Sequence, residues 1–364
     1  MTKDFFQQQV QRDLDLIAEQ PQLAQTLAQL KQQVTRVFVT GAGGFLGKAI
    51  CRFLRAENIA VVGFARGTYP DLTALGVEMK QGDIADSQAL TKAMHGCDLV
   101  FHVASKAGVW GSKQDYFLPN VTGVENLIAA CEQLGIDKLV YTSTPSVTFD
   151  GVDENGVDES YPYASNFLNY YGESKAIAEQ KVLDANSPIL KTVAIRPHLI
   201  WGPGDPHLVP RVIERAKAGR LKLVGKQDKL VDTIYVDNAA YAHLLAALQL
   251  CQEQPKCAGK CYFVSNDEPI AMAKMLNLIL SAAHLPPVNK RVPAGVAYFV
   301  GAVLETVYRL LDKQQEPIMT KFVAKQLSTS HYFDISAIKR DLAYQPLVSI
   351  EQGMALLAQS LESE

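Results

Sequence analysis

The chain has 364 residues, of which 48% are hydrophobic and 20% are charged. This composition excludes a disordered or fibrous protein and allows a large buried core. The length predicts roughly two structural regions, at about 150 residues each. The net charge of -3 gives no electrostatic footprint for a nucleic acid, so we expect no nucleic-acid partner.

The cysteines and the apolar segments indicate a soluble cytoplasmic protein. The six cysteines lack the spacing of a CxxC or zinc motif, so we expect free thiols and no metal site. The polar N-terminus does not resemble a signal peptide. The longest apolar stretch, from Val292 to Leu304, is shorter than the ~20 residues of a membrane-spanning helix.

Residues 1–33 form a Gln-rich segment without glycine. Apolar residues such as Leu23, Leu27 and Leu30 recur at helical spacing, and Pro21 is a natural break. The pattern predicts a helical extension of two short helices. It serves either as a docking or dimerisation arm or, as the amphipathic pattern favours, as a cover packed on the body of the protein.

From Val34 onward, short apolar strands alternate with helical segments. Strands are expected at 36–40, 60–64, 77–81, 99–103, 139–142 and 192–196, with a first helix over 45–57. This alternation predicts a doubly wound parallel sheet of the Rossmann type over residues 34–200. Residues 201–364 are expected to form mainly a smaller substrate-binding lobe, with segments around 231–270 returning to the sheet.

The first strand leads directly into a glycine-rich loop and then a helix. Glycines in this setting allow a tight turn and a close approach of the backbone to a pyrophosphate, which the helix N-terminus also attracts. We therefore expect a dinucleotide site formed by Gly41, Gly43, Gly44, Phe45, Leu46 and Gly47.

The end of the second strand favours NADP(H) over NAD(H). An NAD site usually has an acidic residue there, whereas this chain has Arg66, whose guanidinium suits a 2′-phosphate. Asp83 and Ile84 follow the third strand and are expected to meet the adenine.

Tyr171 and Lys175 form a YxxxK pair on one face of a helix expected over 167–185. The nearby ammonium of Lys175 and the positive charge of an oxidised nicotinamide would together lower the pKa of the phenol and so assist proton transfer. Thr144 follows the fifth strand and would polarise a substrate carbonyl, while Tyr171 donates the proton as general acid. Tyr170 is the competing phenol, but it has no lysine four residues later.

Together these motifs resemble the extended short-chain dehydrogenases/reductases over roughly residues 34–246. The matching segments are 40–47, 83–84, 101–104, 120–123, 141–144, 171–175 and 196–205. The resemblance implies catalytic roles for Thr144, Tyr171 and Lys175, with Lys175 also holding the nicotinamide ribose. It also implies that Ala104, Ser143 and Pro197 line the cofactor.

Within that family, the 3β-hydroxysteroid dehydrogenase/isomerase branch is the most similar, on segments 196–205, 232–240, 331–334 and 342–346. The region of residues 229–231 lacks the arginine with which a nucleotide-sugar epimerase holds a diphosphate, so an apolar substrate is favoured. The chain is most similar to bacterial 2-alkyl-3-oxoalkanoate reductases of olefin biosynthesis, which implies NADPH-dependent reduction of a long-chain keto acid. The alternatives are a 3β-hydroxysteroid or sterol dehydrogenase, an NAD-dependent epimerase, and an NADP-sensing regulator without activity.

Several further residues are candidate substrate or partner contacts. Lys106 could meet a substrate carboxylate, Trp110 an alkyl chain, and His198 either the substrate or the core. The apolar helix expected over 294–311 could cover a hydrophobic ligand, lie on a membrane as a peripheral contact, or pack in the core. The resemblance implies a homodimer paired near Asn120 and Tyr171, and other enzymes of the same pathway are possible partners.

Overall fold

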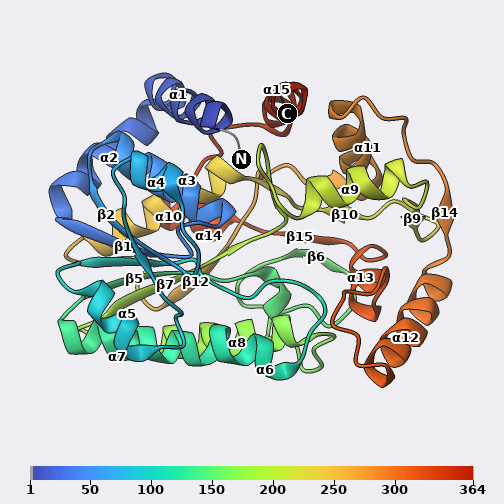
Figure 1. Cartoon of the computed structure of the whole chain (residues 1–364), viewed down its shortest axis with the longest axis horizontal. Helices are drawn as coiled ribbons and strands as arrows, with labels where there is room; N and C mark the ends of the chain where they lie inside the picture. Colours follow the sequence, from blue (N-terminus) through green and yellow to red (C-terminus); the bar gives the residue numbers. More distant parts are fainter. Residues whose placement is uncertain (1–2, 364) are drawn as a thin grey trace.

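A computed structural model describes residues 3–363 and is built around a seven-stranded sheet (Figure 1). The strand order is β12-β7-β5-β4-β1-β2-β3, and every neighbouring pair is parallel. The strands are β1 (Arg36–Thr40), β2 (Ala60–Ala65), β3 (Glu78–Gln81), β4 (Leu99–His102), β5 (Lys138–Thr142), β7 (Lys191–Pro197) and β12 (Lys260–Val264).

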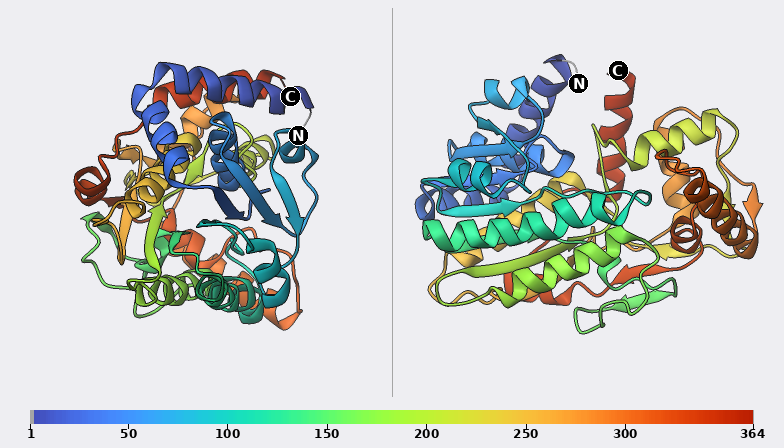
Figure 2. Two further views of the ribbon diagram at one scale, coloured as in Figure 1. Left: turned by 90° about the vertical axis from the view of Figure 1, so that its left-hand side faces the viewer. Right: turned by 60° about the horizontal axis from the view of Figure 1, so that its bottom comes forward.

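Helices cover both faces of this sheet, as Figures 1 and 2 show. One face carries α3 (Phe45–Ala56) and α10 (Val236–Leu250), and the other carries α5 (Ser87–Met94), α7 (Gly123–Leu134) and α8 (Tyr170–Asp184). Side chains of β1 alternate between the two cores: Val37 and Val39 pack on the α3 side and Phe38 on the α7 side. The expected Rossmann-type doubly wound sheet is therefore confirmed.

Most of the remaining chain forms a second, smaller lobe. Its four-stranded sheet has the order β13-β10-β15-β6, formed by β6 (Glu154–Val157), β10 (Leu230–Val231), β13 (Ile270–Ala271) and β15 (His331–Phe333). Its helices are α9 (Leu208–Lys217), α11 (Met272–Ala282), α12 (Ala294–Leu310) and α13 (Lys321–Gln326). Two short parallel pairs complete it: β8 (Ile200–Trp201) with β11 (Ile234–Tyr235), and β9 (Leu223–Val224) with β14 (Arg291–Val292).

Residues 260–264 return to the main sheet as β12, which forms its edge beside β7. The residues near position 231 instead form β10 of the second lobe, because β10 pairs with β13 and β15. The chain closes with α14 (Ser336–Leu342) and α15 (Ile350–Ser363). Two shorter helices, α4 (Pro70–Ala74) and α6 (Lys113–Phe117), border the ends of the central strands.

The N-terminal segment forms two helices, α1 (Lys3–Glu19) and α2 (Pro21–Gln33), separated at the predicted proline. Leu23, Leu27 and Leu30 are fully buried on the α3 and α10 side of the sheet. The extension is therefore packed on the body of the protein, and α1 lies on the same side of the molecule as α15 (Figures 1 and 2).

Among the described residues, no helix combines the length and the apolar character needed to cross a membrane. All six cysteines are free, as expected from their spacing. Burial raises the pKa of the Cys51 and Cys131 thiols to about 12.

Candidate active site

A cleft with a volume of about 970 Å³ opens at the carboxyl ends of the central strands. This is the edge of a parallel sheet where α/β proteins bind ligands. Of the residues expected from the sequence, the cleft is lined by Gly41, Gly44, Phe45, Leu46, Arg66, Asp83, Ile84, Ala104, Lys106, Ser143, Thr144, Tyr171, Lys175 and Pro197. Residues up to 156 positions apart in the chain, from Gly41 to Pro197, thus lie along one cleft.

The glycine loop brings three backbone segments into close contact. Gly41 has a φ of +65°, and a Cβ at this position would lie 2.7 Å from the backbone nitrogen of Ala104. At Gly47 a Cβ would lie 2.2 Å from the carbonyl oxygen of Gly41. Gly44 caps α3 without a side-chain hydrogen bond, so no side chain occupies the N–H groups of the first helical turn. These N–H groups and the helix dipole fit the pyrophosphate of a dinucleotide.

Tyr69 is a residue of this cleft that the sequence reasoning missed. A Cβ on Gly43 would lie 2.0 Å from the Tyr69 ring, so Gly43 serves this contact and does not itself line the cleft. Lys48 lies 5.4 Å from the centre of the ring and forms an ion pair with Asp71 on α4. The sequence signal for Tyr69 was weak: an aromatic residue that precedes Pro70, the first residue of α4, shortly after the second strand.

Thr40, at the end of β1, fixes the wall of the cleft that Val103 and Ala104 form. Its Oγ1 accepts hydrogen bonds from the backbone N–H groups of Val103 and Ala104, each at 3.1 Å, and lies 2.7 Å from Nδ1 of His102. Burial, followed by the charge of Lys175, lowers the pKa of His102 to about 3. His102 is therefore a neutral structural residue at physiological pH.

Arg66 is exposed at the end of β2, where its side chain lines the outer part of the cleft. Its carbonyl oxygen accepts a hydrogen bond from Nε2 of Gln81, which fixes the backbone there. Asp83 also lines the cleft, and its carboxylate accepts the N–H of Ala85 at 2.9 Å. Arg66 and Asp83 thus line the part of the cleft at the carboxyl ends of β2 and β3.

The helix α8 presents Tyr171 and Lys175 to the cleft. It begins at Tyr170 and not at 167, because the Asn169 side chain caps it by accepting the N–H of Gly172 at 2.8 Å. Burial raises the pKa of the Tyr171 phenol, and a hydrogen bond with Thr144 opposes this rise. Tyr170 does not line the cleft.

Lys175 is almost fully buried beside the fifth strand. Its Nζ donates to the carbonyl oxygen of Thr142 at 2.6 Å and lies 4.1 Å from the centre of the Tyr141 ring. Burial lowers the pKa of Lys175 to about 7, while the carboxylate of Glu179 raises it. The lowering of the Tyr171 pKa by Lys175 together with an oxidised nicotinamide stays a prediction; in the protein alone, burial raises the pKa of the phenol. The phenol is therefore protonated at neutral pH, as a general acid must be.

Glu179, one turn beyond Lys175 on α8, is a second residue that the sequence reasoning missed. It is fully buried and accepts hydrogen bonds from Nε and Nη2 of Arg196, at 2.9 and 2.5 Å, and from the Tyr163 hydroxyl at 2.7 Å. Arg196 lies on β7, so this pair joins α8 to the sheet. The sequence did carry one signal for Glu179: it lies four residues after Lys175 and therefore on the same face of the helix.

Asn120 fixes the loop that carries Lys106. Its side chain accepts the N–H of Lys106 at 2.7 Å, donates to the Lys106 carbonyl at 3.1 Å, and donates to Oγ of Ser174 on α8 at 3.0 Å. Asn120 lies in a short π-helical segment, Leu118–Thr122. Lys106 is consequently held at the cleft by its backbone while its side chain is exposed.

Two of the candidate substrate contacts lie elsewhere. Trp110 does not line the cleft: its Nε1 donates to the carbonyl oxygen of Lys313, and its ring packs edge-on against Tyr308 at the end of α12. His198 is buried, with its Nε2 2.7 Å from Nδ1 of His331. Both side chains point into the second lobe, which their positions in the sequence did not indicate.

Helix α12 is not packed in the core. Its buried residues are Ala297, Gly301 and Glu305, and Glu305 accepts the N–H of Lys321 at 2.7 Å. The exposed large apolar residues from this helix and its C-terminal end are Val296, Tyr298, Phe299, Val300, Val303, Val307, Leu310 and Leu311. Of the three alternatives given by the sequence, core packing is therefore wrong.

A doubly wound sheet, a glycine loop at a helix N-terminus, and a tyrosine and lysine one turn apart beside a threonine define the site of an extended short-chain dehydrogenase/reductase. The sequence model of the 3-beta hydroxysteroid dehydrogenase/isomerase family matches residues 38–291. The chain belongs to this family, and it is an oxidoreductase.

Relatives and solved structures agree with this assignment. The chain is 67% identical to the 2-alkyl-3-oxoalkanoate reductase of Shewanella oneidensis, over 91% of this chain and 88% of the relative. It is 48% identical to the enzyme of the same name from Stenotrophomonas maltophilia, over 89% and 99%. The human sterol-4-alpha-carboxylate 3-dehydrogenase (decarboxylating) is 34% identical, over 91% and 89%. The UDP-glucuronic acid 4-epimerase of Bacillus cereus, solved with NAD, shares the fold with a TM-score of 0.70 at 20% identity, over 90% of this chain and 99% of that one.

Proposed function

We propose that this protein reduces the keto group of a long-chain 2-alkyl-3-oxoalkanoate to the 2-alkyl-3-hydroxyalkanoate with NADPH. The 67% identity to a relative of that name carries the proposal. The cleft supports it, because it combines a dinucleotide loop with a protonated phenol and the hydroxyl of Thr144.

In this mechanism, NADPH supplies a hydride when bound. Thr144 and Tyr171 bind the substrate carbonyl oxygen, and Tyr171 donates its phenolic proton to that oxygen as negative charge develops there. Lys175 holds the nicotinamide ribose and, when protonated, stabilises the phenolate that proton transfer leaves on Tyr171. The backbone around Gly41 and the start of α3 hold the pyrophosphate.

We assign the preference for NADPH over NADH to Arg66, and the binding of the substrate's carboxylate to Lys106. A guanidinium at the end of β2 suits a 2′-phosphate, and no carboxylate stands in the segment 64–67 to accept a ribose hydroxyl. An exposed lysine in the loop held by Asn120 suits the carboxylate of a keto acid. Asp83 and Ile84 lie where an adenine would follow, with Ala104, Ser143 and Pro197 toward the nicotinamide.

The test is to follow cofactor absorbance with the purified protein, NADPH or NADH, and a 2-alkyl-3-keto acid, a 3-ketosteroid or a UDP-sugar. We expect turnover of the keto acid, with NADPH faster than NADH. Arg66→Ala should weaken NADPH binding with little effect on NADH, at about 1.5–3 kcal/mol for a hydrogen-bonded charge. Turnover of the UDP-sugar alone would overturn the proposed substrate, and an unchanged preference in Arg66→Ala would overturn the role of Arg66.

A sterol-carboxylate dehydrogenase activity is the second candidate, favoured by the relatives of that name at 33–35% identity. Such a substrate also carries a carboxylate, so Lys106 would serve both. The ratio of kcat/KM between a long-chain keto acid and a sterol acid separates the two.

We propose that α12 makes a peripheral contact with a membrane surface. Phe299 and Leu310 are 68% and 81% exposed, and the basic residues Arg309 and Lys321 lie beside the helix, where both pair with Glu305. Co-sedimentation with phosphatidylglycerol vesicles should fall in the double variant Phe299→Ser/Leu310→Ser. Ile189→Ser, which removes an equally exposed residue on another surface, is the matched control; equal loss in both would overturn the contact.

We also propose a homodimer through the surface of α7 and α8, two helices that lie side by side in Figure 2. Other enzymes of olefin biosynthesis are the further partners that we propose. Mass determination in solution tests the dimer. A monomeric mass at micromolar concentration would contradict it.

A further inference from the structure

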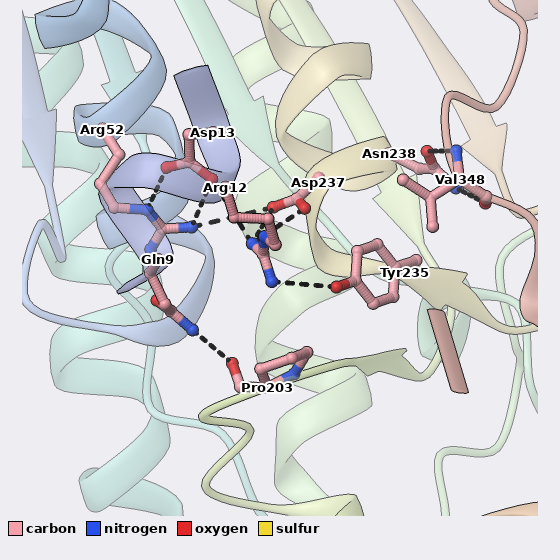
Figure 3. A network of polar contacts seen from close by, with 9 residues as sticks. All are labelled: Gln9, Arg12, Asp13, Arg52, Pro203, Tyr235, Asp237, Asn238 and Val348. Carbon is pink, nitrogen blue, oxygen red and sulfur yellow. Dashed lines mark hydrogen bonds and ion pairs between the residues drawn. The ribbon is translucent and has the colours of Figure 1, made fainter. Parts of the chain in front are cut away.

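The N-terminal helix α1 contributes to a buried cluster of four alternating charges (Figure 3). Arg12 contacts Asp237 with two hydrogen bonds, at 3.0 and 3.3 Å, and Asp13 accepts from Nε of Arg52 at 2.5 Å. Arg52 in turn lies 3.8 Å from Asp237. Three of the four side chains are at least 96% buried, and Arg12 is 18% exposed.

This cluster does not simply attach α1 to the sheet. Arg52 belongs to α3, which follows the glycine loop, and Asp237 is the second residue of α10, which follows β11 directly. Arg12 also donates from Nη1 to the Tyr235 hydroxyl at 3.1 Å. Tyr235 pairs with Trp201 in the β8–β11 ladder, and the two rings pack edge-on at 5.3 Å.

The strand β8 connects this contact to the cleft. It consists of Ile200, which lines the cleft, and Trp201, which is fully buried. The turn after it contains Gly202 and Gly204, both at positive φ, a conformation that favours glycine. Gln9 of α1 donates from Nε2 to the carbonyl oxygen of Pro203, between these glycines, at 3.0 Å.

The same turn positions the start of α9. Asp205 accepts the N–H groups of His207, Leu208 and Val209 at 2.8 to 3.0 Å. His207 and Leu208 both line the cleft. A displacement of the turn would therefore move the wall formed by these two residues.

We infer that α1 is a positioning element for the substrate side of the cleft: Gln9 and Arg12 hold the 202–205 turn and β11, and thereby fix His207 and Leu208. This role rests on the proposed reaction only where substrate kinetics are the measurement. It gives the N-terminal extension, which lies outside the matched family region of residues 38–291, a purpose in this enzyme.

The decisive variant is Gln9→Ala, because it removes the contact with Pro203 and leaves the charge cluster intact. We expect faster hydrogen–deuterium exchange at residues 202–209, with unchanged exchange at residues 41–47. We also expect KM for the keto acid to rise by about fivefold, while kcat and NADPH affinity are retained. This factor corresponds to the free energy of one hydrogen bond, the one that Gln9→Ala removes. Gln11→Ala is the matched control, since Gln11 is exposed on the same helix and, among the described residues, its side chain bonds only to Asp15.

Arg12→Lys should give an intermediate effect, because a lysine keeps the charge but cannot reach Tyr235 and Asp237 together. Unchanged exchange at residues 202–209 in Gln9→Ala would overturn the inference. So would a general rise in exchange with a parallel loss of kcat, KM and NADPH affinity, since α1 would then act on stability alone. If the wild-type protein does not reduce the keto acid, the proposed reaction fails, and the exchange experiment still decides the role of α1.

Discussion

Replacing Lys175 by methionine is expected to stabilise the fold while ending catalysis. Lys175 is 2% exposed, and burial lowers its pKa from 10.5 to about 7. At about 1.4 kcal/mol per pKa unit, the buried ammonium destabilises the folded state by roughly 4 kcal/mol near neutral pH. Methionine keeps the aliphatic volume but loses the hydrogen bond to the Thr142 carbonyl, which costs roughly 1–2 kcal/mol. The net gain is roughly 2–3 kcal/mol.

The pH dependence distinguishes this effect from improved packing. Because the pKa of Lys175 is lower in the folded state, the unfolded chain binds the proton more tightly. The destabilisation is therefore full below about pH 7 and is relieved as the pH rises toward 10.5. The advantage of Lys175→Met should shrink by roughly 3 kcal/mol between about pH 6.5 and 9.5.

The assay is urea unfolding at both pH values, followed by tryptophan fluorescence, to which the fully buried Trp201 contributes. Lys181→Met is the control, because Lys181 lies on the same helix, is 39% exposed, and forms an ion pair with Glu125 at the surface. Its stability and activity should both stay close to those of the wild type. A wild-type protein more stable than Lys175→Met at pH 6.5, or a difference that does not change with pH, would refute the reasoning.

Four further outcomes are expected. Tyr171→Phe should lower kcat about 10²–10⁴-fold and retain NADPH binding, measured by fluorescence titration; retained turnover would remove Tyr171 from its role. Thr144→Ser should keep most activity and Thr144→Ala should lose it, since only the hydroxyl is used; equal rates would contradict this. Gly43→Ala should weaken NADPH binding, because its Cβ would displace the ring of Tyr69, and an unchanged Kd would show that the ring moves freely. Leu27→Ala should lower the free energy of unfolding by about 2–5 kcal/mol, and a loss below about 1 kcal/mol would mean that α2 contributes little to the core.

Features that depend on neighbouring residues were predictable from the sequence. The strands, the glycine loop before α3, and the four-residue spacing of Tyr171 and Lys175 are local patterns, and the parallel sheet brings their ends to one edge. The central sheet could therefore be predicted almost completely, with small shifts at the helix ends caused by caps such as Asn169, whereas the short strands of the second lobe were not predicted individually.

Features that depend on side-chain direction or on distant partners could not be predicted. His198 faces His331, 133 residues later, and Trp110 turns toward α12 instead of the cleft. Tyr69 reaches the glycine loop across a segment with no recognisable motif. The burial that raises the pKa of the Tyr171 phenol is likewise a property of the folded structure.

The burial of Arg12 has a consequence for how the chain folds as it is synthesised. Its partner Asp237 follows 225 residues later, so at ~5–20 residues per second the first helix waits roughly 10–45 s for that partner to be made. During this time Leu23, Leu27 and Leu30 also lack α10, against which they are finally buried. The nascent chain thus exposes an apolar helical stripe at its leading end, which is the kind of segment that chaperones bind, until residues beyond 237 have left the ribosome.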